Sequence, residues 1–102
     1  MARLLVLYNK PADPAAFDRY YFETHVPIAK KVPGLRSYIV NDGPLNVVAG
    51  SQLPYLIAEL EFDSMPDLQS ALASVEGQAA AADLSNFAQA GVTLITFETR
   101  RA

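Results

Sequence analysis

The stretch Pro54–Phe62 (PYLIAELEF) decides the fold, because its residues alternate in character along the chain. Alternation over this length is typical of a β-strand, whose successive side chains point to opposite faces of a sheet. One face is entirely apolar: Leu56, Ala58, Leu60 and Phe62. The other begins apolar and then becomes acidic: Tyr55, Ile57, Glu59 and Glu61. We therefore expect the first face to pack on the core and the second to carry apolar surface beside its charges.

Three further segments have the length and composition of strands, with breaker residues at their ends. They are Arg3–Asn9, Leu35–Asn41 and Val92–Glu98. The first and the last of these also carry apolar side chains on both faces: Leu4, Val6 and Tyr8 opposite Leu5 and Leu7, and Val92 and Leu94 opposite Ile95 and Phe97. The four segments together predict a four-stranded sheet.

The chain between the first two strands predicts a helix with a clear start. Asp13 is a favourable N-cap, and Pro14 at the first helical position loses only an N–H that has no partner there. The spacing of large side chains predicts one buried face: Phe17, Tyr21, Thr24 and Ile28. Pro27 lies within this pattern and is expected to kink or loosen the helix near residues 23–26, because it lacks a backbone donor. His25 is expected beside the buried face.

Two consecutive helical pieces are predicted between the third and fourth strands. Ser64, with Asp67 three residues later, fits a capping box. Ser74 is the expected second N-cap, from which a helix continues to Ala90 and ends at Gly91. The side chains expected to face the core are Leu68, Leu72 and Val75 in the first piece, and Leu84, Phe87 and Ala88 in the second.

The resulting element order, βαββαβ, predicts an α+β fold. Right-handed crossovers favour a four-stranded antiparallel sheet with both helices on one face, the ferredoxin-like arrangement. The chain has 102 residues and shows no repeat, linker or low-complexity segment. We therefore expect residues 1–102 to form a single domain.

The composition excludes several classes of function. The chain has no cysteine, which excludes disulfides, thiolate zinc sites, iron–sulfur clusters and a cysteine nucleophile. A net charge of −3 gives no basic footprint for nucleic acid. No apolar run approaches the ~20 residues that span a bilayer, and residues 1–8 lack the features of a signal peptide. We expect a cytoplasmic protein that binds neither nucleic acid nor a membrane.

The sheet face that the helices leave uncovered is expected to carry much apolar surface. Large apolar patches seldom stay in contact with water, so we expect two copies to pack sheet against sheet as a homodimer. Glu59 lies on this face. It is interpreted either as a buried acid or as a carboxylate at the interface or its rim, and the second interpretation, with Arg36 as its partner, is the favoured one.

His25 is the only histidine of the chain. A neutral imidazole accepts a proton near pH 7, which suits general acid–base chemistry in a cleft between helix and sheet. The alternative is a structural histidine that forms a hydrogen bond inside the core. The sequence leaves both interpretations open.

Aromatic residues near His25 are candidates for the walls of a pocket. Small-molecule sites combine apolar walls with a few polar groups. The side chains expected to bind a substrate are Tyr8, Phe17, Tyr21 and Tyr38. Tyrosine is also common at the boundary of an ordinary core, so a structural role is the alternative.

Other chemistries lack their patterns in this sequence. One histidine with scattered carboxylates gives no metal-ligand spacing, and neither a nucleophile elbow nor a glycine-rich phosphate loop occurs. One axial histidine suffices for haem, but the segment around His25 does not specify such a site. We expect neither a cofactor nor a metal. Residues 42–53 are long for a hairpin connection and are interpreted either as a lid or as a tolerated insertion.

Two parts of the chain resemble the signature of EthD-domain proteins. The first is Tyr20–Ala29 (YYFETHVPIA), followed by Val32–Tyr38 (VPGLRSY). The second, Ser74–Ala79 (SVEGQA) with Asp83–Phe87 (DLSNF), is similar to the second-helix region of that family. The resemblance covers nearly the whole chain. It implies two ferredoxin-like protomers packed sheet to sheet as a dimeric α/β barrel.

The resemblance also implies a range of functions. The family is named for a protein required in ethyl tert-butyl ether degradation, and related barrels include cofactor-free monooxygenases, muconolactone isomerases and polyketide cyclases. By that similarity, His25 is the expected catalytic residue of a cofactor-independent oxidoreductase, isomerase or cyclase. The expected substrate is small, hydrophobic and oxygenated. The alternative is a non-catalytic accessory protein that binds or delivers a metabolite or supports a partner oxygenase.

Overall fold

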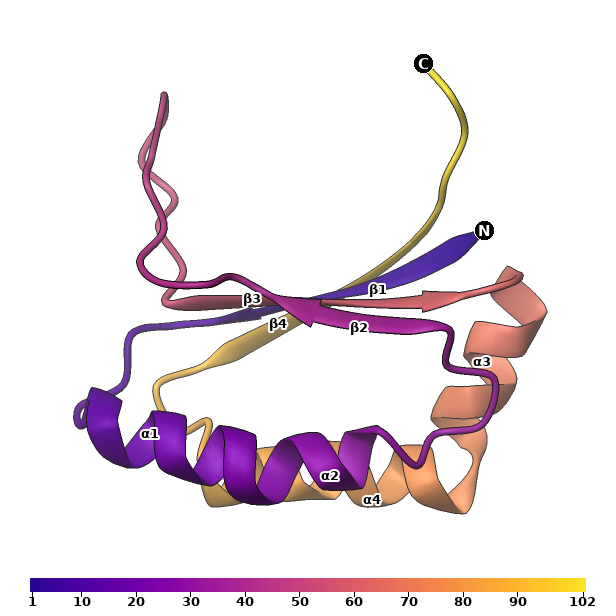
Figure 1. Cartoon of the computed structure of the whole chain (residues 1–102), viewed down its shortest axis with the longest axis horizontal. Coiled ribbons are helices and arrows are strands. Elements are labelled where there is room, and N and C mark those ends of the chain that lie inside the picture. Colours follow the sequence, from indigo (N-terminus) through magenta and orange to yellow (C-terminus); the bar gives the residue numbers. More distant parts are fainter.

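A four-stranded antiparallel sheet carries all the helices on one of its faces (Figure 1). The computed structural model describes residues 1–102. The strands are β1 (Ala2–Tyr8), β2 (Ser37–Val40), β3 (Leu56–Phe62) and β4 (Val92–Glu98), in the spatial order β2-β3-β1-β4. This arrangement confirms the predicted α+β, ferredoxin-like order of elements.

The two central strands, β1 and β3, bury every second side chain against the helices. Their register pairs Leu4 with Leu60 and Val6 with Ala58, so apolar residues of both strands share the core face. On the other side of β1, Val6 pairs with Leu94 of β4. Leu94 therefore points toward the helices as well, yet it stays 46% exposed because β4 lies at the edge of the sheet.

The first helical segment changes its winding at its centre. It begins with α1 (Pro14–Tyr20), continues as a π-helical turn η1 (Tyr21–His25) and ends with α2 (Val26–Ala29). Asp13 caps the start, accepting from the Ala16 N–H at 3.1 Å. The wide turn closes with the Val26 N–H donating to the Tyr21 carbonyl. It coincides with the distortion expected from Pro27, which supplies no N–H and whose ring crowds the preceding turn of an α-helix.

The π-helical turn moves the buried face of this helix by one residue. The buried side chains are Phe17, Tyr21, His25 and Ala29. Thr24 is exposed and His25 is buried, so the prediction that Thr24 faces the core and His25 lies beside it is wrong. The wide turn needs an additional residue before the chain again faces the sheet, and that residue places His25 inward.

The second helical region consists of α3 (Met65–Ala73), α4 (Val75–Asp83) and a 3₁₀ turn η2 (Leu84–Asn86). Ser64 and Ser74 cap α3 and α4 as predicted, each accepting from the N–H three residues on. The predicted continuation to Ala90 is wrong, because the backbone leaves the helical conformation at Phe87. Leu72 and Val75 are exposed, Val75 to 80%, so the prediction that both face the core is wrong. The extended backbone at Ser74 ends α3, and the side chains of α4 therefore do not continue its buried face.

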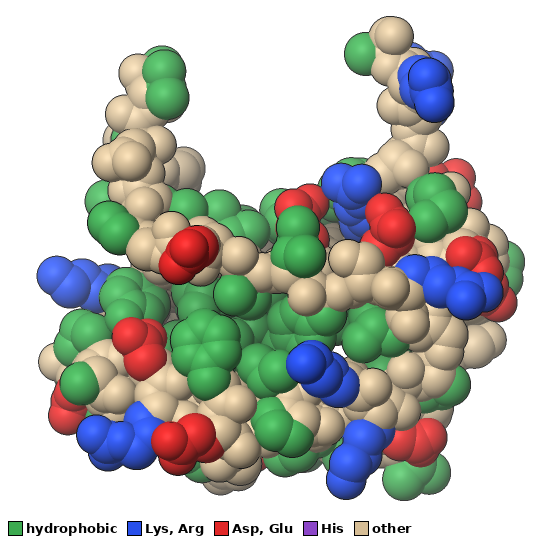
Figure 2. All heavy atoms as spheres, viewed as in Figure 1, with side chains coloured by type: hydrophobic (Ala, Val, Ile, Leu, Met, Phe, Trp, Pro, Cys, Tyr) green, Lys and Arg blue, Asp and Glu red, His purple; other side chains and the backbone are tan.

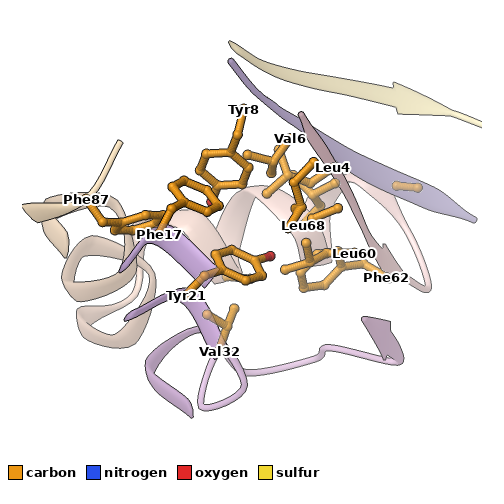
Figure 3. Close-up of a cluster of buried hydrophobic side chains, with 14 residues drawn as sticks. Leu4, Val6, Tyr8, Phe17, Tyr21, Val32, Leu60, Phe62, Leu68 and Phe87 are labelled. Carbon is orange, nitrogen blue, oxygen red and sulfur yellow. The ribbon is translucent and has the colours of Figure 1, made fainter. Parts of the chain in front are cut away.

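The core between the sheet and the helices is rich in aromatic rings (Figure 3). Tyr8 points from the end of β1 toward the helices, with its ring centroid 5.5 Å from that of Phe17 and 5.4 Å from that of Tyr21. Phe87 contacts all three of these rings. Edge-to-face and tilted contacts of this kind hold the rings in fixed orientations.

The opposite face of the sheet has no cover and combines an ion-pair group with apolar side chains. Arg3 pairs with Glu59 at 3.4 Å and with Glu61 at 3.2 Å. Arg36 pairs instead with Asp63, so its predicted pairing with Glu59 is wrong. Strand alternation gives the reason, because Ser37 lies opposite Glu61 and its neighbour Arg36 therefore points to the other side.

Two segments project beyond this uncovered face. The connection 41–55 and the C-terminal residues after β4 both leave the sheet on the side away from the helices (Figures 1 and 2). Exposed apolar side chains occur on the face and on the connection: Ile39, Val47, Val48, Leu53, Ile95 and Phe97. None of the helices has the length and apolar character needed to cross a membrane.

Candidate active site

His25 and Asp83 form a buried pair between two helical segments. His25 is the last residue of the π-helical turn, and Asp83 is the last residue of α4. The imidazole Nδ1 lies 2.9 Å from Asp83 Oδ2, and the two residues are 5% and 7% exposed. Helix α4 contacts α2 directly, which brings the two helix segments to this distance.

Asp83 is held as a carboxylate by three donors. The Tyr20 hydroxyl donates to Oδ1 at 2.7 Å, and Asn86 Nδ2 donates to the same oxygen at 2.9 Å. Burial acts to raise the pKa of Asp83, but the hydrogen bonds from Tyr20, Asn86 and His25 outweigh it and hold the pKa below its usual value. Because Oδ1 is already occupied, Oδ2 is the oxygen that faces His25.

The carboxylate fixes the tautomer of His25. A carboxylate only accepts hydrogen bonds, so Nδ1 carries the proton and Nε2 carries the lone pair. Burial lowers the pKa of His25, and the hydrogen bond and charge of Asp83 offset this only in part. The imidazole is therefore neutral at pH 7, with Nε2 as an acceptor.

Nε2 of His25 faces a cavity between the sheet and the helices. The structure has no fully enclosed side-chain nitrogen or oxygen that lacks a hydrogen-bond partner. Since Nε2 takes part in no hydrogen bond of the protein, it borders accessible space, and His25 lines a cavity of about 60 Å³. Thirteen of the fifteen lining residues are hydrophobic and none is charged at pH 7.

The cavity opens at one edge of the sheet. Two of its lining residues, Leu72 at the end of α3 and Leu94 on β4, are 38% and 46% exposed. They form an apolar rim where the cavity borders solvent. A ligand larger than the enclosed volume would extend past this rim toward solvent.

The predicted pocket residues occupy two layers around the cavity. Tyr8 and Tyr38 line it together with His25. Tyr21 lies behind them, with its hydroxyl oxygen 2.6 Å from that of Tyr38. Phe17 stacks on Tyr21 with an interplanar angle of 5° and belongs to the aromatic core.

The polar partners of His25 were not predicted from the sequence. The sequence predicts Asp83 inside a longer helix, and Tyr20, which donates to Asp83, is not among the predicted site residues. A signal for Asp83 exists in hindsight, because it is the only charged residue between Gln78 and Glu98. No group of three or more His, Asp or Glu side chains lies close enough together to hold a metal ion.

The fold and the site together define a class of protein. Its members are ferredoxin-like domains with an apolar cavity beside a buried histidine–aspartate pair. Within that class, residues 9–91 match the model of the EthD domain. The chain belongs to the EthD family.

Individual relatives are consistent with this assignment. An uncharacterized 11.0 kDa protein of Rhodococcus erythropolis, from the thcB-thcC intergenic region, is 42% identical over 96 residues, which are 93% of this chain and 91% of that protein. The crystal structure of an ethyl tert-butyl ether degradation (EthD) family protein from Bacillus halodurans is 37% identical, with a TM-score of 0.87 and coverage of 98% and 99%. SnoaB of Streptomyces nogalater, a cofactor-independent oxygenase, shares the fold at 14% identity, with a TM-score of 0.66 and coverage of 99% and 94%.

Proposed function

We propose that this protein is a cofactor-independent enzyme that binds a small, uncharged, largely apolar molecule and removes a proton from it with His25. The observation that carries the proposal is the neutral imidazole, oriented by Asp83, whose Nε2 opens into an apolar cavity. A histidine of this kind is a general base that needs no metal or organic cofactor to act. Charged ligands are disfavoured because the cavity wall offers them no counter-charge.

The surroundings of the pair also support proton transfer. When Nε2 accepts a proton, the imidazolium that forms lies 2.9 Å from a carboxylate that is already ionised. The ion pair stabilises the protonated state inside a site of low polarity. SnoaB, which shares the fold, is a cofactor-independent oxygenase. Removal of a proton makes an organic molecule electron-rich, and an electron-rich molecule is more readily oxidised or isomerised.

A binding protein without turnover is the second candidate. The enclosed volume of about 60 Å³ is small, and an acceptor in an apolar wall also serves simple recognition. Such a protein would deliver a metabolite or support a partner oxygenase. It would use the same cavity with the same neutral His25.

We also propose that two copies pair through the uncovered face of the sheet. A Bacteroides fragilis protein of unknown function with the same fold is dimeric. The exposed apolar residues Ile39, Ile95 and Phe97 supply the area that pairing would bury. The projecting connection 41–55 would then extend alongside the partner.

NMR of the His25 ring nitrogens tests the enzymatic proposal, because the single histidine gives one unambiguous signal pair. A panel of small phenols, lactones, ketones and ethers is added to the whole protein in D₂O. Binding should shift the Nε2 resonance strongly and leave Nδ1 bonded to Asp83. If the wild type exchanges a ligand proton for deuterium and His25→Gln does not, the result supports the enzyme. Binding without such exchange supports the accessory protein. A ring that responds to no member of the panel would contradict both.

A further inference from the structure

We infer that Tyr8 and Tyr38 form a pair of O–H donors that holds one carbonyl oxygen of the ligand, in the same cavity that the Nε2 of His25 faces. The inference rests on the proposed function and names the substrate class: a compact, uncharged carbonyl compound that can form an enol. Two donors and one acceptor are the polar groups that this apolar cavity presents.

The Tyr8 hydroxyl has no partner in the protein. Tyr8 is 2% exposed, and no hydrogen bond from its side chain occurs. Since no enclosed polar side-chain atom lacks a partner, the Tyr8 oxygen must border the cavity that its ring lines. Burial raises the pKa of Tyr8, and the neighbouring Tyr38 and Asp83 raise it further by smaller amounts. The hydroxyl therefore keeps its proton and remains a donor.

The second donor comes from the pair of Tyr21 and Tyr38. Their oxygens lie 2.6 Å apart, so one hydroxyl donates to the other. Tyr21 is fully buried and does not line the cavity, and its proton therefore goes to the Tyr38 oxygen. The proton of Tyr38 is then free to point into the cavity, which Tyr38 does line.

Tyr8 and His25 lie on neighbouring walls of the same space. Both rings pack against Tyr21, with centroid distances of 5.4 Å and 5.6 Å, and both pack against Phe87, at 5.6 Å and 4.7 Å. A small ligand can therefore meet the hydroxyl donors with one atom and Nε2 with another.

This arrangement fits one reaction step. The C–H bond next to the carbonyl breaks, and its proton moves to His25 Nε2. The electron pair of that bond forms a C=C bond, while the π pair of the carbonyl moves onto oxygen. The resulting enolate oxygen accepts from Tyr8 and Tyr38. Where the substrate carries a further C=C bond conjugated with this enolate, return of the proton to the far carbon of that bond shifts the double bond and gives an isomer without any oxidant. Fixed donors aimed at such an oxygen are an effective means of stabilising a transition state.

A phenol with a chromophore tests the donor pair, because a phenolate resembles an enolate in its charged oxygen. The probe is 4-nitrophenol, whose visible absorbance reports its ionisation, and nitrobenzene is the ligand without the hydroxyl. We expect 4-nitrophenol to enter uncharged and to pass its proton to His25, so that the phenolate and the imidazolium balance each other's charge in the cavity. It should then bind at least 10-fold more tightly than nitrobenzene. Tyr8→Phe and Tyr38→Phe should each weaken its binding about 10-fold or more, as loss of a hydrogen bond to a charged oxygen does.

The matched control is Tyr55→Phe, which removes a tyrosine hydroxyl bonded to Asp18 outside this cavity. It should leave 4-nitrophenol binding unchanged. Tyr8→Phe should also keep the melting temperature of the wild type, because its hydroxyl has no protein partner to lose. Equal binding to the wild type and to both cavity variants would overturn the donor pair while leaving proton acceptance by His25 intact. Equal affinity for both probes, or no binding of either, would overturn the substrate class as well.

Discussion

His25 and Asp83 are 58 residues apart in the chain, and their buried side chains meet at 2.9 Å. The carboxylate faces the helices and the imidazole faces the cavity, so the pair has a polar side and an apolar side. Tyr20 and Asn86 donate to Asp83 Oδ1, and His25 Nδ1 donates to Oδ2. The lone pair of His25 is therefore on Nε2, in the residue that lines the cavity. The proposed role of His25 as a base depends on this direction.

Asp83→Asn should invert the tautomer of His25. The new amide nitrogen would face Nδ1 as a donor, so Nδ1 becomes the acceptor and the proton moves to Nε2. Nε2 of His25 then donates a hydrogen bond and can no longer accept a proton. Any turnover that depends on proton removal by Nε2 should fall by about 100-fold or more. The free energy of unfolding should drop by about 1–3 kcal/mol, because hydrogen bonds to a charge are lost. Ring nitrogen shifts at neutral pH check the tautomer, and retention of the proton on Nδ1 would contradict this account.

The stability of the protein should depend on His25 below neutral pH. Burial lowers the pKa of His25 in the folded state, so the unfolded chain binds the proton more readily. The histidine contribution is complete above the unfolded value of 6.5, and stability is lost as the pH falls below it. For the uptake of one proton, the free energy of unfolding can change by at most about 1.4 kcal/mol per pH unit. Urea unfolding between pH 7.5 and about 5 measures it, in a range above the titration of ordinary carboxylates.

His25→Gln is the matched control for this pH dependence, since it retains a polar side chain and has no proton to gain. Its free energy of unfolding should be nearly flat over the same range. The lowered pKa of Asp83 predicts a separate loss at more acidic pH, below its usual value of 3.8. A wild-type curve that is also flat down to about pH 5 would mean that His25 titrates in the folded state as it does in the unfolded state.

Gly77→Ala should destabilise the contact between α3 and α4. A Cβ at this position would lie 2.1 Å from the Ala71 carbonyl oxygen and 2.8 Å from that of Leu72, both of them backbone atoms. Relief of this overlap requires the two helices to separate, and overpacking of this kind costs about 1–3 kcal/mol. Thermal unfolding measures the loss. Ala79→Ser, an exposed position in the same helix, should change stability by no more than about 0.5 kcal/mol.

Charge on the uncovered sheet face should separate the proposed dimer. Ile95→Lys places an ammonium group where apolar surface would be buried against the partner, and sedimentation should then report the mass of one chain in place of two. Val75→Lys is the control, because Val75 is equally apolar and 80% exposed but lies on the helical side. A wild-type protein that sediments as a monomer at micromolar concentration would rule out the pairing.

The strands and the helix starts could be predicted from the sequence because local rules determine them. The alternation in Pro54–Phe62 predicted the face that is buried, and side-chain oxygens of Asp13, Ser64 and Ser74 cap helices where expected. His25 could be selected because it is unique in the chain. These signals each lie within a few residues of the feature that they predict.

The partners of His25 depend on features without a local signal. The regular period that fits Phe17, Tyr21 and Ile28 places Thr24 inward, three residues after Tyr21. The wide π-helical turn instead favours the residue four positions after Tyr21, which is His25. Asp83 is the only charged residue in its part of the chain, but it follows a run of alanines that fits a longer helix, so no local pattern predicts that a helix ends there. Both errors arise where tertiary packing overrides the regular period, which is common at functional sites.

The π-helical turn also means that the first helix contains one residue more than its path requires. Deleting one residue from the exposed stretch Phe22–Thr24 would reduce the separation of Tyr21 and His25 from four positions to three. A regular α-helix also places residues three apart on one face, so the shortened helix would still direct both side chains inward. The residue count of this stretch can therefore change by one while His25 stays on the buried face.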